Sequence, residues 1–385
     1  MLALIGLFAL AGAAPADAAA VNDGAWPEPA QILVWSPERR LRAFSDYAGT
    51  FPTRPVGTAG RSYPLTAAPR DFSSLSYDLD GERHRLDDFV KKTRVAGMIV
   101  VQRGRVLYER YALGNGPATL WVGYSIAKSV VSLLYGAALE DGFIASLNDP
   151  VVRYLPRLAG GAYDRVTIEQ LLQMSSGVGW REDYEDPEAD VSRSPSAILP
   201  FIDYMRALPT AAPPGTRFNY STGETNLAGA VLRAAIGNNL ATYLTHRIWK
   251  PFGMEAEANW MLGAPGGAEY GGCCISATLR DYARLGIFAL REGTAGDGRR
   301  PLPSGWMKRS TSPAATNPGY GYFWWLRPDG SYAALGIFGQ MIWVDPKSQT
   351  VVATHSAWPR ATDAGLSAHR WAMLDALSAH LAAGS

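Results

Sequence analysis

The 385-residue sequence predicts a mixed α/β protein in which an antiparallel sheet is flanked by helices and interrupted by an inserted, mostly helical domain. Residues 95–101 and 106–111 are apolar, β-branched runs on either side of a short glycine turn, which is typical of a β-hairpin. Strand-like runs return only between residues 321 and 355, whereas helical spacing of apolar residues dominates 123–265. Strands from both ends of the chain can therefore form one sheet, with the helical middle packed beside it.

The predicted elements follow in order along the chain. Residues 21–75 are rich in Pro, Gly and Ala without periodicity, so they are predicted to form an arm on the surface of the body. A helix is predicted from Ser125 to about Ala138, because apolar residues recur there every three or four positions. Further helices are predicted at 167–174, 196–208, 225–236, 240–249, 276–291 and 366–383, and C-terminal strands at 321–326, 332–335, 341–344 and 350–355.

The order of these elements suggests two domains and a leader. The sheet domain is assigned to residues 76–122 and 266–385, and the helical domain to residues 123–265. An apolar run at 2–14 precedes several alanines and is too short to span a bilayer, which favours a signal peptide over residues 1–20. We therefore expect a periplasmic or secreted protein without a membrane anchor.

Composition restricts the classes of partner. Lys and Arg number 36 and Asp and Glu 35, so the formal net charge is +1 and no basic surface for nucleic acid is expected. A small-molecule substrate is the expected partner, and the sequence leaves both a monomer and a homodimer open. His84, His246, His355 and His380 lack the spacing of metal ligands, so neither a metal nor another cofactor is predicted.

The two cysteines, Cys273 and Cys274, are adjacent in the sequence. Neighbouring Cα atoms are held about 3.8 Å apart, which is a poor geometry for a disulfide. We therefore expect no bridge, and we expect the two side chains to pack as small residues beside the preceding pair of glycines.

Ser125 and Lys128 form a Ser-x-x-Lys motif at the start of a predicted helix. Residues three apart lie on one face of a helix, and the helix N-terminus favours negative charge at the serine oxygen. A lysine in an apolar pocket has a lowered pKa and can accept the serine proton. Ala127 and Val130 favour such a pocket. Taken alone, however, the motif more often marks a helix-capping serine beside a solvated lysine.

A rival interpretation of the same serine is the Gly-x-Ser-x-Gly turn of α/β-hydrolases, to which residues 123–127 are a near match. Asp345 and His355 follow in the order that such a triad requires. This interpretation is the weaker one, because the chain lacks the regular alternation of strands and helices on which that fold is built.

Tyr220 lies in a loop just before the helix predicted at 225–236. Its phenol could there reach Ser125 and, with Lys128 nearby, act as a base, although a tyrosine in such a loop more often only packs. The order of the Ser-x-x-Lys motif, the Tyr-Ser-Thr run at Tyr220 and a Gly-rich turn at 336–340 resembles the serine β-lactamase and penicillin-binding protein superfamily.

Other stretches resemble one branch of this superfamily. Residues 148–156 and 166–177 resemble the class C β-lactamases and family VIII esterases, and parts of 90–385 resemble the 6-aminohexanoate-dimer hydrolases. The resemblance implies a β-lactamase-like fold and roles for single residues. It implies Ser125 as nucleophile, Lys128 and Tyr220 as the proton-transfer pair, the backbone N–H groups of Ser125 and Ile337 as an oxyanion hole, and Tyr184 and His369 as substrate-binding residues.

The segment 336–340 departs from the family pattern. β-Lactamases and transpeptidases carry Lys or His, then Thr and Gly, to hold a substrate carboxylate, whereas no cation stands here, and Phe338 replaces a histidine of the dimer hydrolases. We therefore expect an acyl-enzyme on Ser125 that hydrolyses short-chain carboxylic esters and, less readily, linear amides such as 6-aminohexanoate oligomers. The alternative is a non-catalytic, penicillin-binding-like protein that binds a cell-wall peptide.

Overall fold

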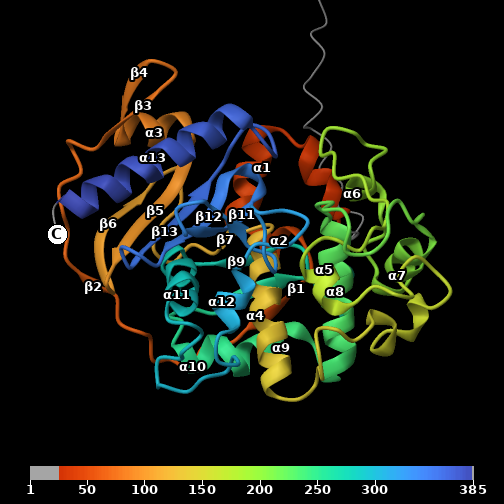
Figure 1. Cartoon of the computed structure of the whole chain (residues 1–385). Helices are drawn as coiled ribbons and strands as arrows, with labels where there is room; N and C mark the ends of the chain where they lie inside the picture. Colours follow the sequence, from red (N-terminus) through yellow and green to blue (C-terminus); the bar gives the residue numbers. More distant parts are fainter. Residues whose placement is uncertain (1–25, 384–385) are drawn as a thin grey trace, which may run out of the picture.

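The computed structural model describes residues 26–383, so the predicted signal peptide at 1–20 lies outside the described residues. Within 26–383 no helix is long and apolar enough to cross a membrane. Helices surround a large sheet, as the sequence predicts (Figure 1). The helices are α1 Pro37–Ser45, α2 Tyr47–Thr50, α3 Leu86–Lys92, α4 Ile126–Glu140, α5 Ile168–Leu172, α6 Asp190–Arg193, α7 Ile198–Ala207, α8 Thr222–Ile236, α9 Leu240–Leu244, α10 Lys250–Phe252, α11 Leu279–Leu290, α12 Trp306–Ser310 and α13 Ala364–Ala383.

A seven-stranded sheet has the order β10-β11-β12-β13-β5-β6-β2. Neighbouring strands are antiparallel, except that β2 runs parallel to β6. The two ends of the chain meet where β13 pairs with β5, which confirms the predicted sheet built from distant segments. The strands are β2 Thr66–Ala67, β5 Val95–Gln102, β6 Arg105–Tyr111, β10 Trp325–Leu326, β11 Tyr332–Gly336, β12 Gln340–Asp345 and β13 Thr350–Ser356.

Both faces of this sheet are covered by helices. Side chains alternate between the two faces of a strand, so neighbouring residues of β5 belong to different cores. Ile99 and Val101 pack in a core that includes α4 and α11, whereas Met98 and Val100 pack in a core with α3 and α13. Figure 1 shows α13 lying across its face of the sheet. Burial on both faces explains why β5 is a continuous apolar run rather than an alternating one.

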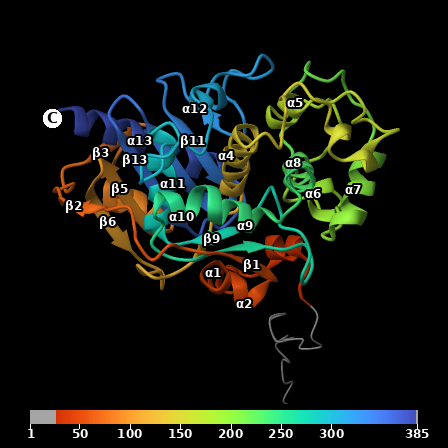
Figure 2. The ribbon, with the colours of Figure 1, turned by 90° about the horizontal axis from the view of Figure 1, so that it is seen from below.

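Helix α4 is the centre of the molecule. Every residue from Ile126 to Ala138 is buried, and the helix contacts β11 and β12 on one side and α8 on the other (Figure 2). A helix that is apolar on all sides belongs in a core, which is where the structure has it. The helix predicted from Ser125 is thereby confirmed, with its first helical residue one position later.

A second sheet, of order β1-β8-β9-β7, has no counterpart in the sequence predictions. Its strands have two to four residues, too few for a period-2 pattern to be seen. The predicted helix 276–291 begins inside this sheet, because Thr278 caps α11 by accepting a hydrogen bond from the Asp281 N–H at 3.1 Å. The strands are β1 Thr53–Val56, β7 Trp121–Val122, β8 Ala258–Met261 and β9 Ile275–Ala277, and a separate hairpin consists of β3 Ser76–Leu79 and β4 Glu82–Arg85.

The N-terminal arm is more than a surface wrapping. Phe44, Tyr47 and Phe51 are at most 2% exposed and belong to one apolar cluster with Trp121 and Tyr124. Figure 2 shows α1 and α2 beside β1 and β9. The arm therefore supports the short segment that leads from β7 into α4.

Gly286 lets α11 lie close to the main sheet. A Cβ added there would be 2.5 Å from Val351 Cγ1 and 2.8 Å from Ile342 Cγ2. Alanine stabilises a helix by about 1 kcal/mol relative to glycine, but overpacking a rigid core costs about 1–3 kcal/mol. We predict that Gly286→Ala lowers the free energy of unfolding measured by urea denaturation. The control is Gly365→Ala in α13, where the nearest atom would be 3.4 Å away; equal changes in the two variants would contradict the prediction.

Candidate active site

Ser125 stands in a strained turn between β7 and α4. Tyr124 before it has a φ of 47°, in the left-handed region that few residues other than glycine occupy. The turn is held by hydrogen bonds from the Gly123 N–H to the Ile275 carbonyl at 2.8 Å and from the Cys274 N–H to the Tyr124 carbonyl at 3.1 Å. Such strain persists where surrounding contacts determine the backbone. The Ser125 hydroxyl does not cap α4, so it is free for another partner.

That partner is Lys128, whose Nζ lies 2.9 Å from Ser125 Oγ. The lysine is 2% exposed and also donates to Thr222 Oγ1 at 3.1 Å and to the Gly272 carbonyl at 2.7 Å. Among the described residues, no carboxylate forms an ion pair with it. Burial lowers the pKa of Lys128 to about 8, while the negative charge of Glu182 opposes this shift. Lys128 can therefore be a neutral base at mildly alkaline pH.

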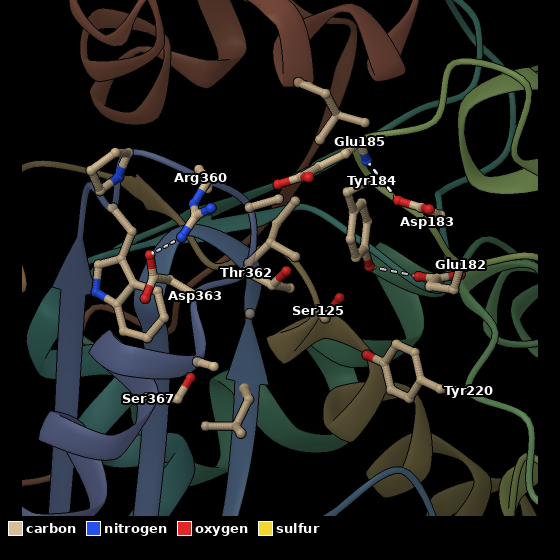
Figure 3. Close-up of a pocket in the computed structure, with 18 of the residues that line it drawn as sticks. Ser125, Glu182, Asp183, Tyr184, Glu185, Tyr220, Arg360, Thr362, Asp363 and Ser367 are labelled. Atoms are coloured by element: carbon tan, nitrogen blue, oxygen red, sulfur yellow. Dashed lines mark hydrogen bonds and ion pairs between the residues drawn. The ribbon is translucent and has the colours of Figure 1, made fainter.

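The Tyr220 phenol points toward Ser125 (Figure 3). Its ring stacks on Trp325, with centroids 5.4 Å apart, and Lys128 Nζ lies 5.5 Å from the ring centroid. Burial and the charge of Glu182 raise the pKa of Tyr220, and its contact with Ser125 opposes them. The phenol is thus protonated at neutral pH, which suits a proton donor better than the base that the sequence suggested.

Glu182 connects these groups, although the sequence marks it only by its place beside Tyr184. Its carboxylate accepts hydrogen bonds from the Tyr184 hydroxyl at 2.6 Å, Trp180 Nε1 at 2.5 Å and the Thr222 N–H at 2.8 Å. The Thr222 hydroxyl also donates to Glu182 while it accepts from Lys128. Thr222 therefore stands between the carboxylate and the lysine, so the negative charge of Glu182 acts on Lys128 without direct contact.

A cavity of about 980 Å³ contains the Ser125 hydroxyl (Figure 3). Tyr184 and Ile337, to which the family resemblance assigns roles, both line it. Ile337 follows Gly336, where an added Cβ would lie 2.2 Å from the Gly123 carbonyl oxygen. Only glycine allows the end of β11 to approach the turn before the serine so closely.

His369, predicted to line the substrate pocket, lies elsewhere. Its Nδ1 is 2.9 Å from the Tyr77 hydroxyl, and its ring packs edge-on against His84. The next residue in α13, Arg370, lines the cavity instead. Successive residues of a helix point about 100° apart because a turn has 3.6 residues, so a neighbour in the sequence faces a different part of the molecule.

The residues of the rival triad are not brought to Ser125. Asp345 accepts a hydrogen bond from the Ser348 hydroxyl at 2.5 Å in the turn after β12. His355 is fully buried, its Nδ1 lies 2.9 Å from Asn115 Nδ2, and burial lowers its pKa to about 3. Neither residue lines the cavity, so the Ser-Asp-His interpretation is wrong for this structure.

The cysteines differ from the expectation, because Cys273 and Cys274 are joined in a disulfide. The expectation rested on the short distance between neighbouring Cα atoms, which is 3.6 Å here. Cys274 has a φ of 76°, in the segment between Gly272 and β9. Within residues 26–383 no group of three or more His, Cys, Asp or Glu side chains is arranged to hold a metal ion.

Comparisons with known proteins agree with this architecture. A family model described as Beta-lactamase matches residues 83–375. The 6-aminohexanoate-dimer hydrolase of Paenarthrobacter ureafaciens is 27% identical over 347 residues, covering 82% of this chain and 85% of that protein. Esterase EstB of Burkholderia gladioli is 30% identical over 217 residues, covering 50% and 55%. A Bacillus anthracis structure, provisionally described as a 6-aminohexanoate-dimer hydrolase, has a TM-score of 0.79 at 22% identity and covers 89% and 94%. The predicted β-lactamase-like fold is confirmed.

Glu182→Gln tests the electrostatic link to the lysine. Removing the negative charge takes away an influence that raises the pKa of Lys128, so that pKa should fall below its value of about 8. The measurement is a pH titration of the lysine Nζ by ¹⁵N NMR. Asp183→Asn is the matched control, because Asp183 is the next residue and lines the same cavity but does not contribute to the shift. An equal fall in both variants, or none in Glu182→Gln, would show that the link is absent.

Proposed function

Because the chain belongs to the beta-lactamase family, whose model matches residues 83–375, we propose that it is a serine hydrolase that forms an acyl-enzyme on Ser125. Its proposed substrates are short-chain carboxylic esters. The observation that carries the proposal is the 2.9 Å contact between Ser125 Oγ and the Nζ of buried Lys128. A hydroxyl beside an amine of lowered pKa is an activated nucleophile.

In acylation, neutral Lys128 accepts the Ser125 proton as Oγ bonds to the substrate carbonyl carbon. The carbonyl oxygen gains negative charge and accepts hydrogen bonds from the backbone N–H groups of Ser125 and Ile337. Tyr220 gives its proton to the departing oxygen as the C–O bond breaks, and the Lys128 ammonium returns a proton to the tyrosine. Water then attacks the acyl carbon, Lys128 accepts a water proton, and this proton returns to Oγ as the acid leaves.

Esters are proposed ahead of amides because an alkoxide or phenolate leaves with less help from a proton donor than an amine does. Linear amides such as 6-aminohexanoate oligomers are the second candidate, since the Paenarthrobacter dimer hydrolase aligns with 82% of the chain. A non-catalytic protein that binds a cell-wall peptide is disfavoured, because the hydroxyl, the amine and the phenol all converge at the mouth of α4. We also propose export to the periplasm or the medium, on the strength of the apolar run at 2–14.

Ser125→Ala should lower turnover of p-nitrophenyl butyrate by at least about 1000-fold, because the nucleophile is lost. Circular dichroism should show an unchanged fold. A fluorophosphonate should add covalently to Ser125 of the wild-type protein, as read by peptide mass spectrometry. Ser312→Ala, at an exposed serine outside the cavity, is the control. Full turnover by Ser125→Ala, or no adduct on the wild-type chain, would refute the proposal.

The pH dependence of turnover should follow Lys128. Only its neutral form accepts the serine proton, and its pKa is lowered to about 8. The value of kcat/KM for p-nitrophenyl butyrate should therefore rise about tenfold per pH unit below this pKa and level off above it. In Glu182→Gln the rising limb should move to lower pH, since the opposing charge is gone. A profile that is flat from pH 6 to 9 would argue against lysine as the base.

A further inference from the structure

Two buried arginines line the cavity that Ser125 also lines, and neither is paired with a carboxylate of residues 26–383. Arg40, on α1, is 7% exposed, and Arg370, on α13, is 6% exposed. Arg40 Nη2 donates one hydrogen bond, to the Pro359 carbonyl at 2.6 Å. The guanidinium of Arg370 has neither a hydrogen-bond nor an ion-pair partner among residues 26–383. Arg360 at the same cavity differs, because it forms an ion pair with Asp363 at 2.7 Å.

Each of the two guanidiniums lies over an aromatic ring. Arg40 Cζ lies 4.9 Å above the ring of Phe338, and Arg370 Cζ lies 4.3 Å above the ring of Trp358. The backbone N–H of Trp358 donates to the backbone carbonyl of Phe338 at 3.1 Å, so the two aromatic residues are adjacent. Phe338 directly follows Ile337, whose backbone N–H is the proposed oxyanion donor. The two arginines therefore line the same cavity as Ser125 and Ile337.

The acidic side chains of the cavity lie on both sides of the serine. Figure 3 shows Glu182 and Asp183 on the side of Tyr184, whereas Glu185 extends toward Arg360 and Asp363 is paired with Arg360. Glu182 is already engaged by three donors. Arg40 and Arg370 are thus left without an ion pair to any acidic side chain of the cavity, since Asp363 is paired with Arg360 and Glu182 is engaged by its own donors.

A guanidinium removed from water without an anionic partner is in an unfavourable state. Burial is the main influence on both groups and lowers the pKa of Arg370 to about 9, as well as that of Arg40. Contact with an aromatic face offsets part of this penalty but uses none of the N–H donors. A planar carboxylate accepts two parallel hydrogen bonds from a guanidinium, which makes it the ligand that best matches the free donors.

We propose that Arg40 and Arg370 bind a carboxylate of the substrate, so that the preferred esters or amides carry a second, free carboxylate. This inference rests on the proposed function, because it names the substrate class of the same site. The hydroxyl of Ser367, one turn before Arg370 and also at the cavity, has no partner within residues 26–383 and adds a donor. The segment 336–340 carries no cation, and α1 and α13 would supply the positive charge instead. Arg40 lies outside residues 83–375, which the family model matches.

Matched ester pairs test the preference in the wild-type protein. Mono-p-nitrophenyl adipate is compared with p-nitrophenyl hexanoate, which places the carboxylate on the acyl group. The compounds 4-butyryloxybenzoate and 4-butyryloxybenzamide place it on the leaving group. We expect kcat/KM to favour the charged member roughly tenfold or more in at least one pair, since a charge-assisted bond replaces an apolar contact. The pair that responds locates the carboxylate. No preference in either pair overturns the inference.

Variants assign the preference to the two arginines. In Arg370→Gln and in Arg40→Gln the charged-to-neutral ratio of kcat/KM should fall roughly tenfold, and Arg370→Lys should restore part of it. Because a ratio is measured, a general loss of active protein cancels. Arg39→Gln is the matched control, since Arg39 directly precedes Arg40 in α1 but does not line the cavity. The Arg39 guanidinium lies over the ring of Trp35, with Cζ 4.0 Å from the ring centroid. A preference that persists in the double variant Arg40→Gln/Arg370→Gln overturns the assignment.

Binding without chemistry separates this inference from the proposed function. Isothermal titration of hexanoate and of hexanamide into Ser125→Ala requires no turnover. Hexanoate should bind at least about tenfold more tightly than hexanamide, and this difference should vanish when Arg370→Gln is added. Equal binding of the two probes overturns the carboxylate site even if esters are hydrolysed. A preference for hexanoate that is lost in Arg370→Gln supports the site even if the ester assays fail.

Discussion

The proposed chemistry depends on a lysine amine that is kept out of water and forms no ion pair with a carboxylate of residues 26–383. Lys128 is held by three neutral oxygens, from Ser125, Thr222 and Gly272, which fix its direction without adding negative charge. A direct ion pair would raise its pKa and keep it protonated, whereas a wholly apolar pocket would leave its N–H groups without partners. Glu182 acts through Thr222 and moderates the effect of burial, so the amine titrates near the pH at which a base is needed.

The surrounding fold keeps this contact in place. Tyr124 has a strained backbone, and its ring packs against Phe44 of the arm and Phe338 in the turn between β11 and β12. The arm, the second sheet and the end of β11 therefore all contact the turn that carries Tyr124. Because Gly336 has no side chain, the end of β11 can lie against that turn. Rigid neighbours on all sides make a single hydroxyl position possible, which is the main requirement for a preorganised nucleophile.

A shared fold does not settle which substrates a site accepts. The segment 336–340 contributes Gly336 and Ile337 to the cavity wall, but no cation. Positive charge enters the cavity from α1 and α13, two helices near opposite ends of the described chain. The same cavity bears carboxylates on the 182–185 loop and at Asp363, of which Asp363 is paired with Arg360. The proposed carboxylate preference would thus be a property of the segments around the family's shared motifs, rather than of the motifs themselves.

The sequence by itself determined the elements whose signal is local. The hairpin of β5 and β6, the helix after Ser125 and the Ser-x-x-Lys spacing depend on periods of two to four residues, which a single segment displays. The order of three motifs added the family and the three side chains that are proposed to react. Only the tertiary structure decided that Glu182 joins the site, that Arg370 rather than His369 faces the cavity, and that Cys273 and Cys274 are bonded. The first two depend on how distant segments pack against one another, and that orientation leaves no periodic trace in the chain. The disulfide joins neighbouring residues whose local backbone, with Cys274 at a φ of 76°, no sequence period reveals.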